Sequence, residues 1–224
     1  MQGLFEKYGI EKYEFFPACN TEDNKVLQVH EKFPHLELPY IACSESHARV
    51  WDLISALPDG QWGLVLEDDV FFHKEWRSLL DRAVNQLPSD WDLFMLDCFY
   101  LGGWDFTSDG NCGSPGIHEA TACSFADAYA ITPTACKWLL KRRSEAIAQG
   151  EWLNNETLLM ELQENGKSFT IIPKLALQHF DESDIQNNAI TAGMASFYQN
   201  PYFLHFPQPL YDYDKPSSIP ASLK

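Results

Sequence analysis

The feature that most constrains this chain is a short apolar run that ends in three consecutive carboxylates. The run covers residues 62–66, and Glu67, Asp68 and Asp69 follow it directly. An apolar run of this length is typical of a strand that is buried on both faces of a sheet. In open α/β sheets, ligands bind beyond the carboxyl ends of the strands. The sequence therefore predicts that the three carboxylates lie at a ligand-binding edge.

Three adjacent carboxylates also indicate a divalent cation. Like charges this close raise one another's pKa, and a bound cation removes that cost. Oxygen ligands suit Mg²⁺ and Mn²⁺, so we predict a Mn²⁺ or Mg²⁺ cofactor held by Glu67 and Asp69. The alternative is a solvated acidic turn, which is the usual setting of a charge run. The apolar residues on both sides of the triplet favour the metal.

The net charge limits the partners. A formal net charge of -16 repels the phosphates of nucleic acids and of anionic membranes. We therefore expect no nucleic-acid partner, and a nucleotide substrate would need a bridging cation. We also expect no membrane span and no signal peptide, since no stretch reaches the roughly 20 apolar residues that a span needs.

The cysteines indicate a reducing compartment. The six cysteines are far apart and form neither a CxxC pair nor the Cys/His spacing of a zinc site. Several lie in apolar runs, where a free cysteine behaves as a small buried hydrophobic residue. We expect a cytoplasmic protein, either free or peripheral to a membrane, without a disulfide framework.

Length and apolar patterning predict one α/β domain. The 224 residues are enough for a single domain with a sizeable core. Apolar residues follow a helical spacing over 76–87, and a strand over 91–96 comes next. Strand, helix and strand form a βαβ unit, which predicts a mixed, mostly parallel sheet flanked by helices. Residues 21–42 are polar and contain two prolines, which is typical of a loop.

Ser44 is predicted to cap the next helix. This start would place Ser46 and His47 in the first turn, where free backbone N–H groups favour an anion. The alternative for His47 is a packing residue, since histidine is intermediate in burial. Later in the chain, Thr132 caps one helix, and Asn154 or Asn155 caps the next. This last helix carries Glu156 in its first turn, where the helix dipole stabilises an ionised carboxylate.

Two further stretches carry candidate residues. Residues 99–123 are rich in glycine, and Tyr100 and Trp104 suit stacking on a sugar or a base, or else anchor this loop in the core. Asp127 lies within an apolar, strand-like run and needs a partner if it is buried. Residues 187–224 are rich in proline and aromatic residues, and we expect them to pack on the domain or to serve an interface.

Several segments, taken in order from about residue 40 to 186, resemble glycosyltransferase family 25. That family includes lipopolysaccharide-type sugar transferases and is similar to the collagen galactosyltransferases. The resemblance rests on Ser44–His47 with Trp51, Leu66–Val70, Ala128–Ile131 with Ala135 and Leu139–Leu140, Ile172–Pro173 and Ser183–Ile185. It implies a GT-A fold, a nucleotide-sugar donor such as a UDP-sugar, and a divalent metal.

The resemblance also assigns roles to residues of this chain. The triplet stands where the family has its DXD-like motif, which gives metal binding to Glu67 and Asp69 and donor binding to Glu67 and Asp68. By resemblance, donor binding also falls to Ser46 and His47, and His179 stands where a further metal ligand is found. Glu156 stands where the family often has an acidic residue. From the residues themselves, we expect Glu156 or Asp127 to be the base if the enzyme inverts, and Tyr100 and Trp104 to be candidates for the acceptor side. Two departures stand out: the usual first strand with its Arg-bearing turn is missing, and Ala42-Cys43 replaces a small glycine.

Together these features predict a GT-A-like domain over residues 1–186. It would move a sugar from a nucleotide-diphosphate sugar to a hydroxyl of a glycan or protein acceptor, by inversion or by retention. Two alternatives remain. One is a non-catalytic glycan-binding module or degenerate transferase. The other is a metal-dependent nucleotidyltransferase, which normally brings a basic phosphate loop that this acidic chain lacks.

Overall fold

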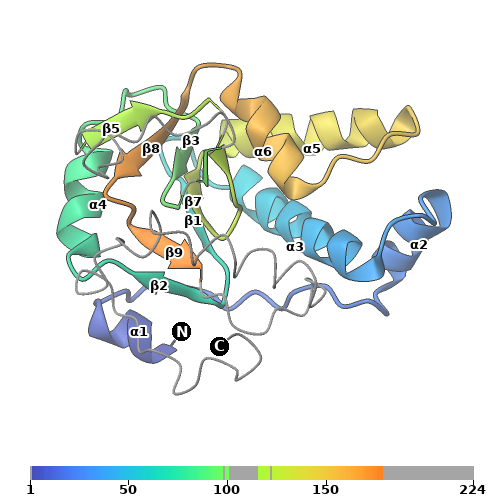
Figure 1. Ribbon diagram of the computed structural model, residues 1–224, viewed down its shortest axis with the longest axis horizontal. Helices are drawn as coiled ribbons and strands as arrows, with labels where there is room; N and C mark the ends of the chain where they lie inside the picture. Colours follow the sequence, from blue (N-terminus) through green and yellow to red (C-terminus); the bar gives the residue numbers. More distant parts are fainter. Residues whose placement is uncertain (1, 98, 101–115, 122, 179–224) are drawn as a thin grey trace, which may run out of the picture.

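The computed structural model describes residues 2–97, 99–100, 116–121 and 123–178 (Figure 1). The fold is a mixed α/β domain in which one central sheet separates two layers. The predicted tail over 187–224 lies outside the described residues. So do two predicted site residues, Trp104 and His179.

The central sheet has five strands in the order β1-β7-β3-β8-β5. Its strands are β1 (Gly63–Leu66), β3 (Leu93–Met95), β5 (Gly116–Glu119), β7 (Ala128–Ile131) and β8 (Ser168–Ile172). The pair β3/β8 is parallel, and the pairs β1/β7, β7/β3 and β8/β5 are antiparallel. The sheet is therefore mixed as predicted, but the prediction that it is mostly parallel is wrong.

The position of β7 explains this difference. Strands β1 and β3 run in the same direction and are joined through α4 (Trp76–Val84), as the predicted βαβ unit requires. However, β7 lies between them and is antiparallel to both. An apolar run looks the same in either chain direction, so its composition predicted a buried strand without its orientation.

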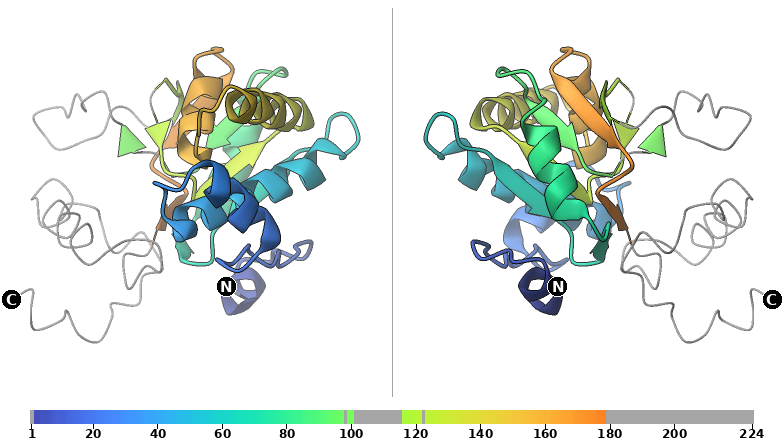
Figure 2. Two further views of the ribbon diagram at one scale, coloured as in Figure 1. Left: turned by 90° about the vertical axis from the view of Figure 1, so that its right-hand side faces the viewer. Right: turned by 90° about the vertical axis from the view of Figure 1, so that its left-hand side faces the viewer.

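Helices cover both faces of the sheet, and Figure 2 shows the two helical layers from either side. One face packs against α3 (Leu38–Ser55), α5 (Pro133–Ala148) and α6 (Asn155–Gln163), and the other packs against α4. Alternation along β3 assigns its side chains to the two cores: Leu93 and Met95 face the first layer, and Phe94 faces the second.

A short helix and two ribbons lie outside the central sheet. Helix α1 (Gln2–Lys7) is followed by a turn at Gly9, which has φ of 64°. Strands β2 (Val70–Phe72) and β9 (Ala176–Gln178) form an antiparallel ribbon, and a second ribbon joins β4 (Phe99–Tyr100) to β6 (Cys123–Ser124). None of the described helices is long and apolar enough to cross a membrane.

The prediction of a loop over residues 21–42 is wrong. Helix α2 (Asn24–Lys32) occupies its first part, and α3 begins at Leu38 rather than at Ser44. The apolar face of α2 is narrow: Val26 and Val29 are buried, while its other residues keep the segment polar. Such a face is sufficient because the helix packs on α3, and this support is a tertiary effect.

The capping predictions for the last two helices are confirmed. The side chain of Thr132 accepts a hydrogen bond from the amide of Ala135 at the start of α5. Asn154 caps α6 by accepting from the amide of Thr157 at 2.8 Å. These caps fix where α6 begins and so place Glu156 in its first turn.

Candidate functional site

Charged side chains from four strands meet at one edge of the central sheet. Glu67 directly follows β1, as predicted, and Asp97 follows β3 after one intervening residue. Lys174 lies just beyond β8, which is parallel to β3. Asp127 directly precedes the antiparallel β7, so it lies at the same edge, and its carbonyl accepts a hydrogen bond from the Glu67 amide at 2.7 Å. This edge is where open α/β sheets bind ligands.

A chain of contacts links helix α3 to this edge. Nε2 of His47 lies 3.1 Å from Oε1 of Glu67, and Nδ1 of His47 lies 2.9 Å from the hydroxyl of Tyr129. The indole N–H of Trp51 donates to the same hydroxyl at 2.9 Å. His47, Trp51 and Tyr129 are buried, so these contacts hold the imidazole in one orientation toward Glu67.

His47 is not at a helix N-terminus. Because α3 begins at Leu38, both His47 and Ser46 lie in the middle of the helix, and the anion-binding argument for the first turn is wrong. Burial alone would lower the pKa of His47. Its interactions with Tyr129, Cys43 and Glu67 outweigh burial and raise that pKa well above its usual value. These interactions favour the protonated form of the imidazole beside Glu67.

Asp127 is the least compensated charge of the site. Its side chain is 2% exposed, and neither carboxylate oxygen has a hydrogen-bond partner in another described residue. Burial, together with the charges of Asp97 and Glu67, raises the pKa of Asp127 well above its usual value. An unpartnered buried carboxylate is costly, and residues of this kind mark ligand-binding and catalytic sites.

The sequence did not predict Asp97 and Lys174 as site residues. Lys174 Nζ lies 2.5 Å from Oδ1 of Asp97, and the Asp97 side chain is 1% exposed. The charge of Lys174 also acts on Asp127. A signal existed, because Asp97 ends a predicted strand in the way that Glu67 follows β1, but nothing in the sequence places Lys174 beside it.

Glu156 belongs to the same group of charges. It lies in the first turn of α6, as predicted, and interacts electrostatically with Glu67 and His47. Burial, with a smaller contribution from the charge of Glu67, raises the pKa of Glu156, although a hydrogen bond from the backbone of Phe125 opposes the shift. The helix dipole was predicted to favour the ionised form of Glu156, but burial shifts its pKa in the opposite direction. Phe125 has φ of 79°, a conformation that non-glycine residues rarely adopt outside constrained sites.

The other predicted residues are distributed as follows. The Ser46 hydroxyl is used within the fold, since it donates to the carbonyl of Ala42 and accepts from the amide of Cys19, both at 2.8 Å. Asp68 is exposed, and Asp69 is partly buried in the turn before β2. The backbone of Tyr100 lies in β4. The roles predicted for these residues remain predictions.

One group of three potential metal ligands occurs among the described residues. It consists of Cys43, His47 and Glu67, whose ligand atoms all lie within 4.8 Å of one another. Asp69 is not part of this group. The third ligand that the sequence predicted, His179, is outside the described residues, so the predicted set of Glu67, Asp69 and His179 is not tested.

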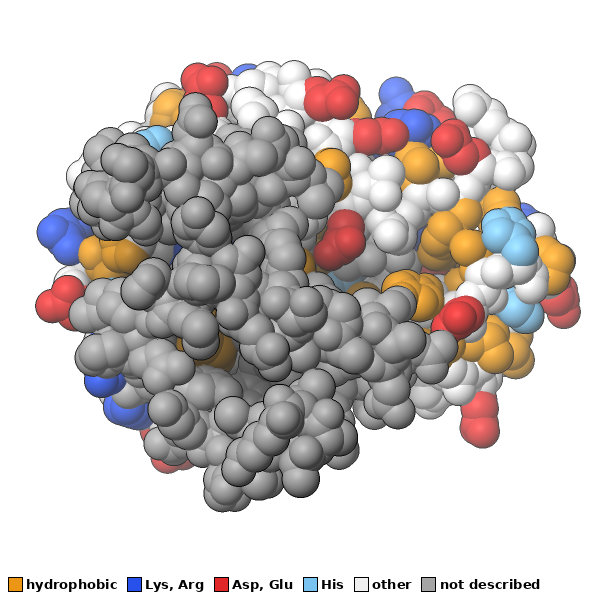
Figure 3. Space-filling view, viewed as in Figure 1, with side chains coloured by type: hydrophobic (Ala, Val, Ile, Leu, Met, Phe, Trp, Pro, Cys, Tyr) orange, Lys and Arg blue, Asp and Glu red, His pale blue; other side chains and the backbone are white. Residues whose placement is uncertain are grey.

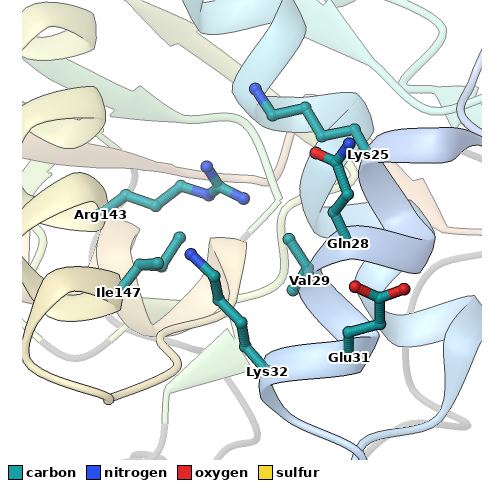
Figure 4. A pocket seen from close by; sticks show the side chains of 7 residues that line it. All are labelled: Lys25, Gln28, Val29, Glu31, Lys32, Arg143 and Ile147. Atoms are coloured by element: carbon teal, nitrogen blue, oxygen red, sulfur yellow. The ribbon is translucent and has the colours of Figure 1, made fainter.

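A separate cavity of about 370 Å³ lies between α2 and α5 (Figure 4). Lys25, Lys32 and Arg143 line it, and Arg143 forms an ion pair with the buried Glu45 of α3. Glu45 and His47 are two residues apart, which is about 200° around a helix, so they lie on opposite faces of α3. The cavity is therefore distinct from the acidic edge.

Two general expectations can also be compared with the structure. In the view of Figure 3, Asp and Glu side chains are spread over the described surface, while Lys and Arg side chains lie near its margins, and the formal net charge is -16. Cys19, Cys43 and Cys136 are free, but Cys123 is disulfide-bonded. One disulfide bond is therefore present where no disulfide framework was expected, and the reducing compartment remains a prediction.

The fold and site together define a class: a mixed α/β protein with an acidic sheet edge, consistent with a Rossmann-like glycosyltransferase. Residues 1–108 match the family model described as glycosyltransferase family 25 (LPS biosynthesis protein). This match supports the resemblance seen in the sequence and, with it, a glycosyltransferase in general. The matched part contains His47 and Glu67 and ends before Asp127 and Glu156. Among curated proteins, none matches the chain.

Proposed function

We propose that this protein is a GT-A-like glycosyltransferase of the hexosyltransferase type. It moves a sugar from a nucleotide-diphosphate sugar to a hydroxyl of a glycan or protein acceptor, and a UDP-sugar is the first donor to test. One observation carries the proposal: Asp127, buried and without a partner in another described residue, lies beside Glu67 at the ligand-binding edge of the sheet. The match to glycosyltransferase family 25 supplies the class of reaction.

A divalent cation fits the residues at this edge. Three carboxylates, those of Glu67, Asp97 and Asp127, lie close enough for their charges to interact, and Lys174 balances only part of this charge. Glu67 and Asp69 would hold Mn²⁺ or Mg²⁺, since such ions are commonly bound by one or two carboxylates together with substrate phosphates. When bound, the ion would offset the negative charge of the donor diphosphate next to this acidic chain.

Glu156 is the residue that we propose as the base. A base must accept a proton from the acceptor hydroxyl, and it does so best when its pKa is raised toward the working pH. The burial of Glu156 raises its pKa in this direction. Asp127 is the second candidate, because its carboxylate has no partner in another described residue and burial raises its pKa as well.

The other residues of the site position these groups. His47 holds the carboxylate of Glu67, the Tyr129 hydroxyl holds His47, and Trp51 donates to that same hydroxyl. The proposed donor site includes His47 and Glu67, with Ser46 and Asp68 as further donor-binding candidates. Tyr100 and Trp104 remain the candidates for contact with the acceptor.

The test is a nucleotide-sugar assay with the purified chain. A panel of nucleotide sugars is incubated with Mn²⁺, with Mg²⁺ or with a chelator, and release of the nucleoside diphosphate is measured with and without candidate acceptors. We expect metal-dependent release with one donor, and a loss of about 10²–10⁴-fold in transfer for Glu156→Gln. Asp52→Asn, an exposed site on α3, is the matched control.

The outcomes separate the alternatives. Binding of glycans without release of the diphosphate from any donor would support a non-catalytic module. Transfer of a nucleotidyl group, with release of pyrophosphate from a nucleoside triphosphate, would support a nucleotidyltransferase. Near wild-type transfer by Glu156→Gln would leave Asp127 as the candidate base.

A further inference from the structure

Cys43 and His47 present two metal-ligating atoms on one face of α3. They are four residues apart, so their side chains lie one above the other on the helix. Glu67, at the end of β1, faces them across the boundary between helix and sheet. The sulfur of Cys43, a ring nitrogen of His47 and a carboxylate oxygen of Glu67 all lie within 4.8 Å of one another. The proposed transfer reaction gives no role to Cys43.

The donor atoms of this group differ from those expected for Mn²⁺ or Mg²⁺. Hard cations of that kind select oxygen ligands, whereas a thiolate together with an imidazole selects a thiophilic ion such as Zn²⁺. One sulfur, one nitrogen and one oxygen are all common zinc ligands, and three protein ligands leave the fourth tetrahedral position open. The group therefore fits Zn²⁺ better than it fits the ion of the proposed donor site.

The surroundings of His47 are those of a metal ligand. Ligating histidines usually hold their second ring nitrogen against a polar partner, which fixes the orientation of the ring. Here Nδ1 of His47 lies 2.9 Å from the hydroxyl of the buried Tyr129, and this leaves Nε2 directed toward Glu67. An ion between Nε2 and the Glu67 oxygen would displace the proton that now joins them.

Cys43 is also accessible to an ion. It is a free thiol of intermediate exposure, whereas Cys19 and Cys136, the other free cysteines among the described residues, are buried. Glu67 is likewise partly exposed, with 29% of its side chain accessible. An ion could therefore reach the group from solvent without unfolding of α3.

We propose that Cys43, His47 and Glu67 form a binding site for a thiophilic divalent cation, with Zn²⁺ as its physiological occupant. Because Glu67 is shared, an ion at this site withdraws it from the donor site, and Zn²⁺ inhibits sugar transfer. The inhibition rests on the proposed function. The binding itself does not.

Cobalt spectroscopy tests the binding without any assay of activity. Metal-free protein is titrated with Co²⁺, which replaces Zn²⁺ and reports its ligands in the absorption spectrum. We expect a thiolate-to-cobalt charge-transfer band in the near ultraviolet that Zn²⁺ abolishes. The band should be lost in Cys43→Ala and kept in Cys19→Ala, and Zn²⁺ affinity should fall by at least about tenfold in Cys43→Ala.

Two results would overturn the site: no charge-transfer band in the wild type, or a band of equal strength in Cys43→Ala. Circular dichroism of each variant shows whether a lost band merely reflects unfolding, and Cys43→Ser provides a second variant of nearly unchanged size.

Inhibition is measured last, as the ratio of transfer with and without Zn²⁺ for each protein. We expect this ratio to rise toward one in Cys43→Ala, and equal inhibition of both proteins overturns the regulatory part. If no donor is transferred at all, the proposed function fails while the cobalt spectra still decide the site.

Discussion

His47 and Glu67 join the helical layer to the acidic edge of the sheet: Nε2 of His47 lies 3.1 Å from Oε1 of Glu67. His47 is on α3, and Glu67 is the first residue after β1. The imidazole is buried and the carboxylate is partly exposed, so the pair lies at the boundary between core and site. This one contact thus stabilises the packing of α3 and also positions Glu67, the proposed metal ligand.

This contact predicts a loss of stability in His47→Ala. The substitution removes the partner of Glu67 and one of the two contacts of the Tyr129 hydroxyl, inside a buried network. We expect the free energy of unfolding to fall by about 1–3 kcal/mol, measured by urea denaturation. His35→Ala, at an exposed position, should change it by less than about 0.5 kcal/mol. Equal effects of the two substitutions would contradict the buried network.

Asp127→Asn should have the opposite effect on stability. The amide has no charge to bury, so in metal-free protein near neutral pH we expect a gain of about 1–3 kcal/mol in the free energy of unfolding. In the assay of transfer, the same variant should lose activity. A loss of stability in Asp127→Asn would mean that the carboxylate has a partner that offsets its burial.

The pH dependence of this gain follows from the raised pKa. The folded carboxyl of Asp127 binds its proton more tightly than the unfolded one, whose pKa is about 3.8. The wild type therefore loses stability as pH rises from 3.8 through the folded pKa, and the advantage of Asp127→Asn grows over the same window. Thermal unfolding of both proteins at several pH values, in the presence of a chelator, measures this pH dependence. A gain that stays constant with pH would exclude the buried charge as its cause.

The sequence predicted those parts of the fold that depend on neighbouring residues. The apolar run before Glu67 forms strand β1, and the residues with helical spacing from Trp76 form helix α4. Thr132 and Asn154 cap helices α5 and α6. Each of these depends on the local order of side chains, so each can be recognised without knowledge of the rest of the chain. The end of β1 was enough to place Glu67 at a site.

The sequence did not predict features that depend on distant contacts. Helix α2 forms because Val26 and Val29 pack against the neighbouring helix, and no local signal shows that partner. The antiparallel insertion of β7 brings Asp127 to the edge from the opposite chain direction. Lys174 meets Asp97 across 77 residues of sequence. Such pairs are set by the topology of the fold, and the topology cannot be read from the local order of residues in a single sequence.

The ion pair between Arg49 and Asp23 links α3 to the start of α2 and should be detectable by titration. Arg49 Nη2 donates to Oδ1 of Asp23 at 2.8 Å, and this hydrogen bond lowers the pKa of Asp23 below its usual value. The stabilisation is therefore present above pH 3.8 and is lost as pH falls through the folded pKa. Carboxyl NMR titration should show the pKa of Asp23 rising toward 3.8 in Arg49→Gln but not in Arg77→Gln. An unchanged pKa in Arg49→Gln would mean that the pair does not form in solution.

Gly63, the first residue of β1, is required by the close approach of Ile54 at the end of α3. A Cβ at position 63 would lie 2.4 Å from Cδ1 and 2.5 Å from Cγ1 of Ile54, whose side chain is buried. Gly63→Ala should therefore lower the free energy of unfolding by about 1–3 kcal/mol through overpacking.

Ile54→Ala alone should lower the free energy of unfolding by about 2–5 kcal/mol, because it leaves a cavity. In the double variant the new methyl group occupies part of that cavity, so the combined loss should be smaller than the sum by about 0.5–3 kcal/mol. Gly3→Ala, where a Cβ meets nothing within 4 Å, is the control and should cost no stability. Additive losses at positions 54 and 63 would mean that Ile54 moves aside, and that the contact between α3 and β1 is not rigid at this point.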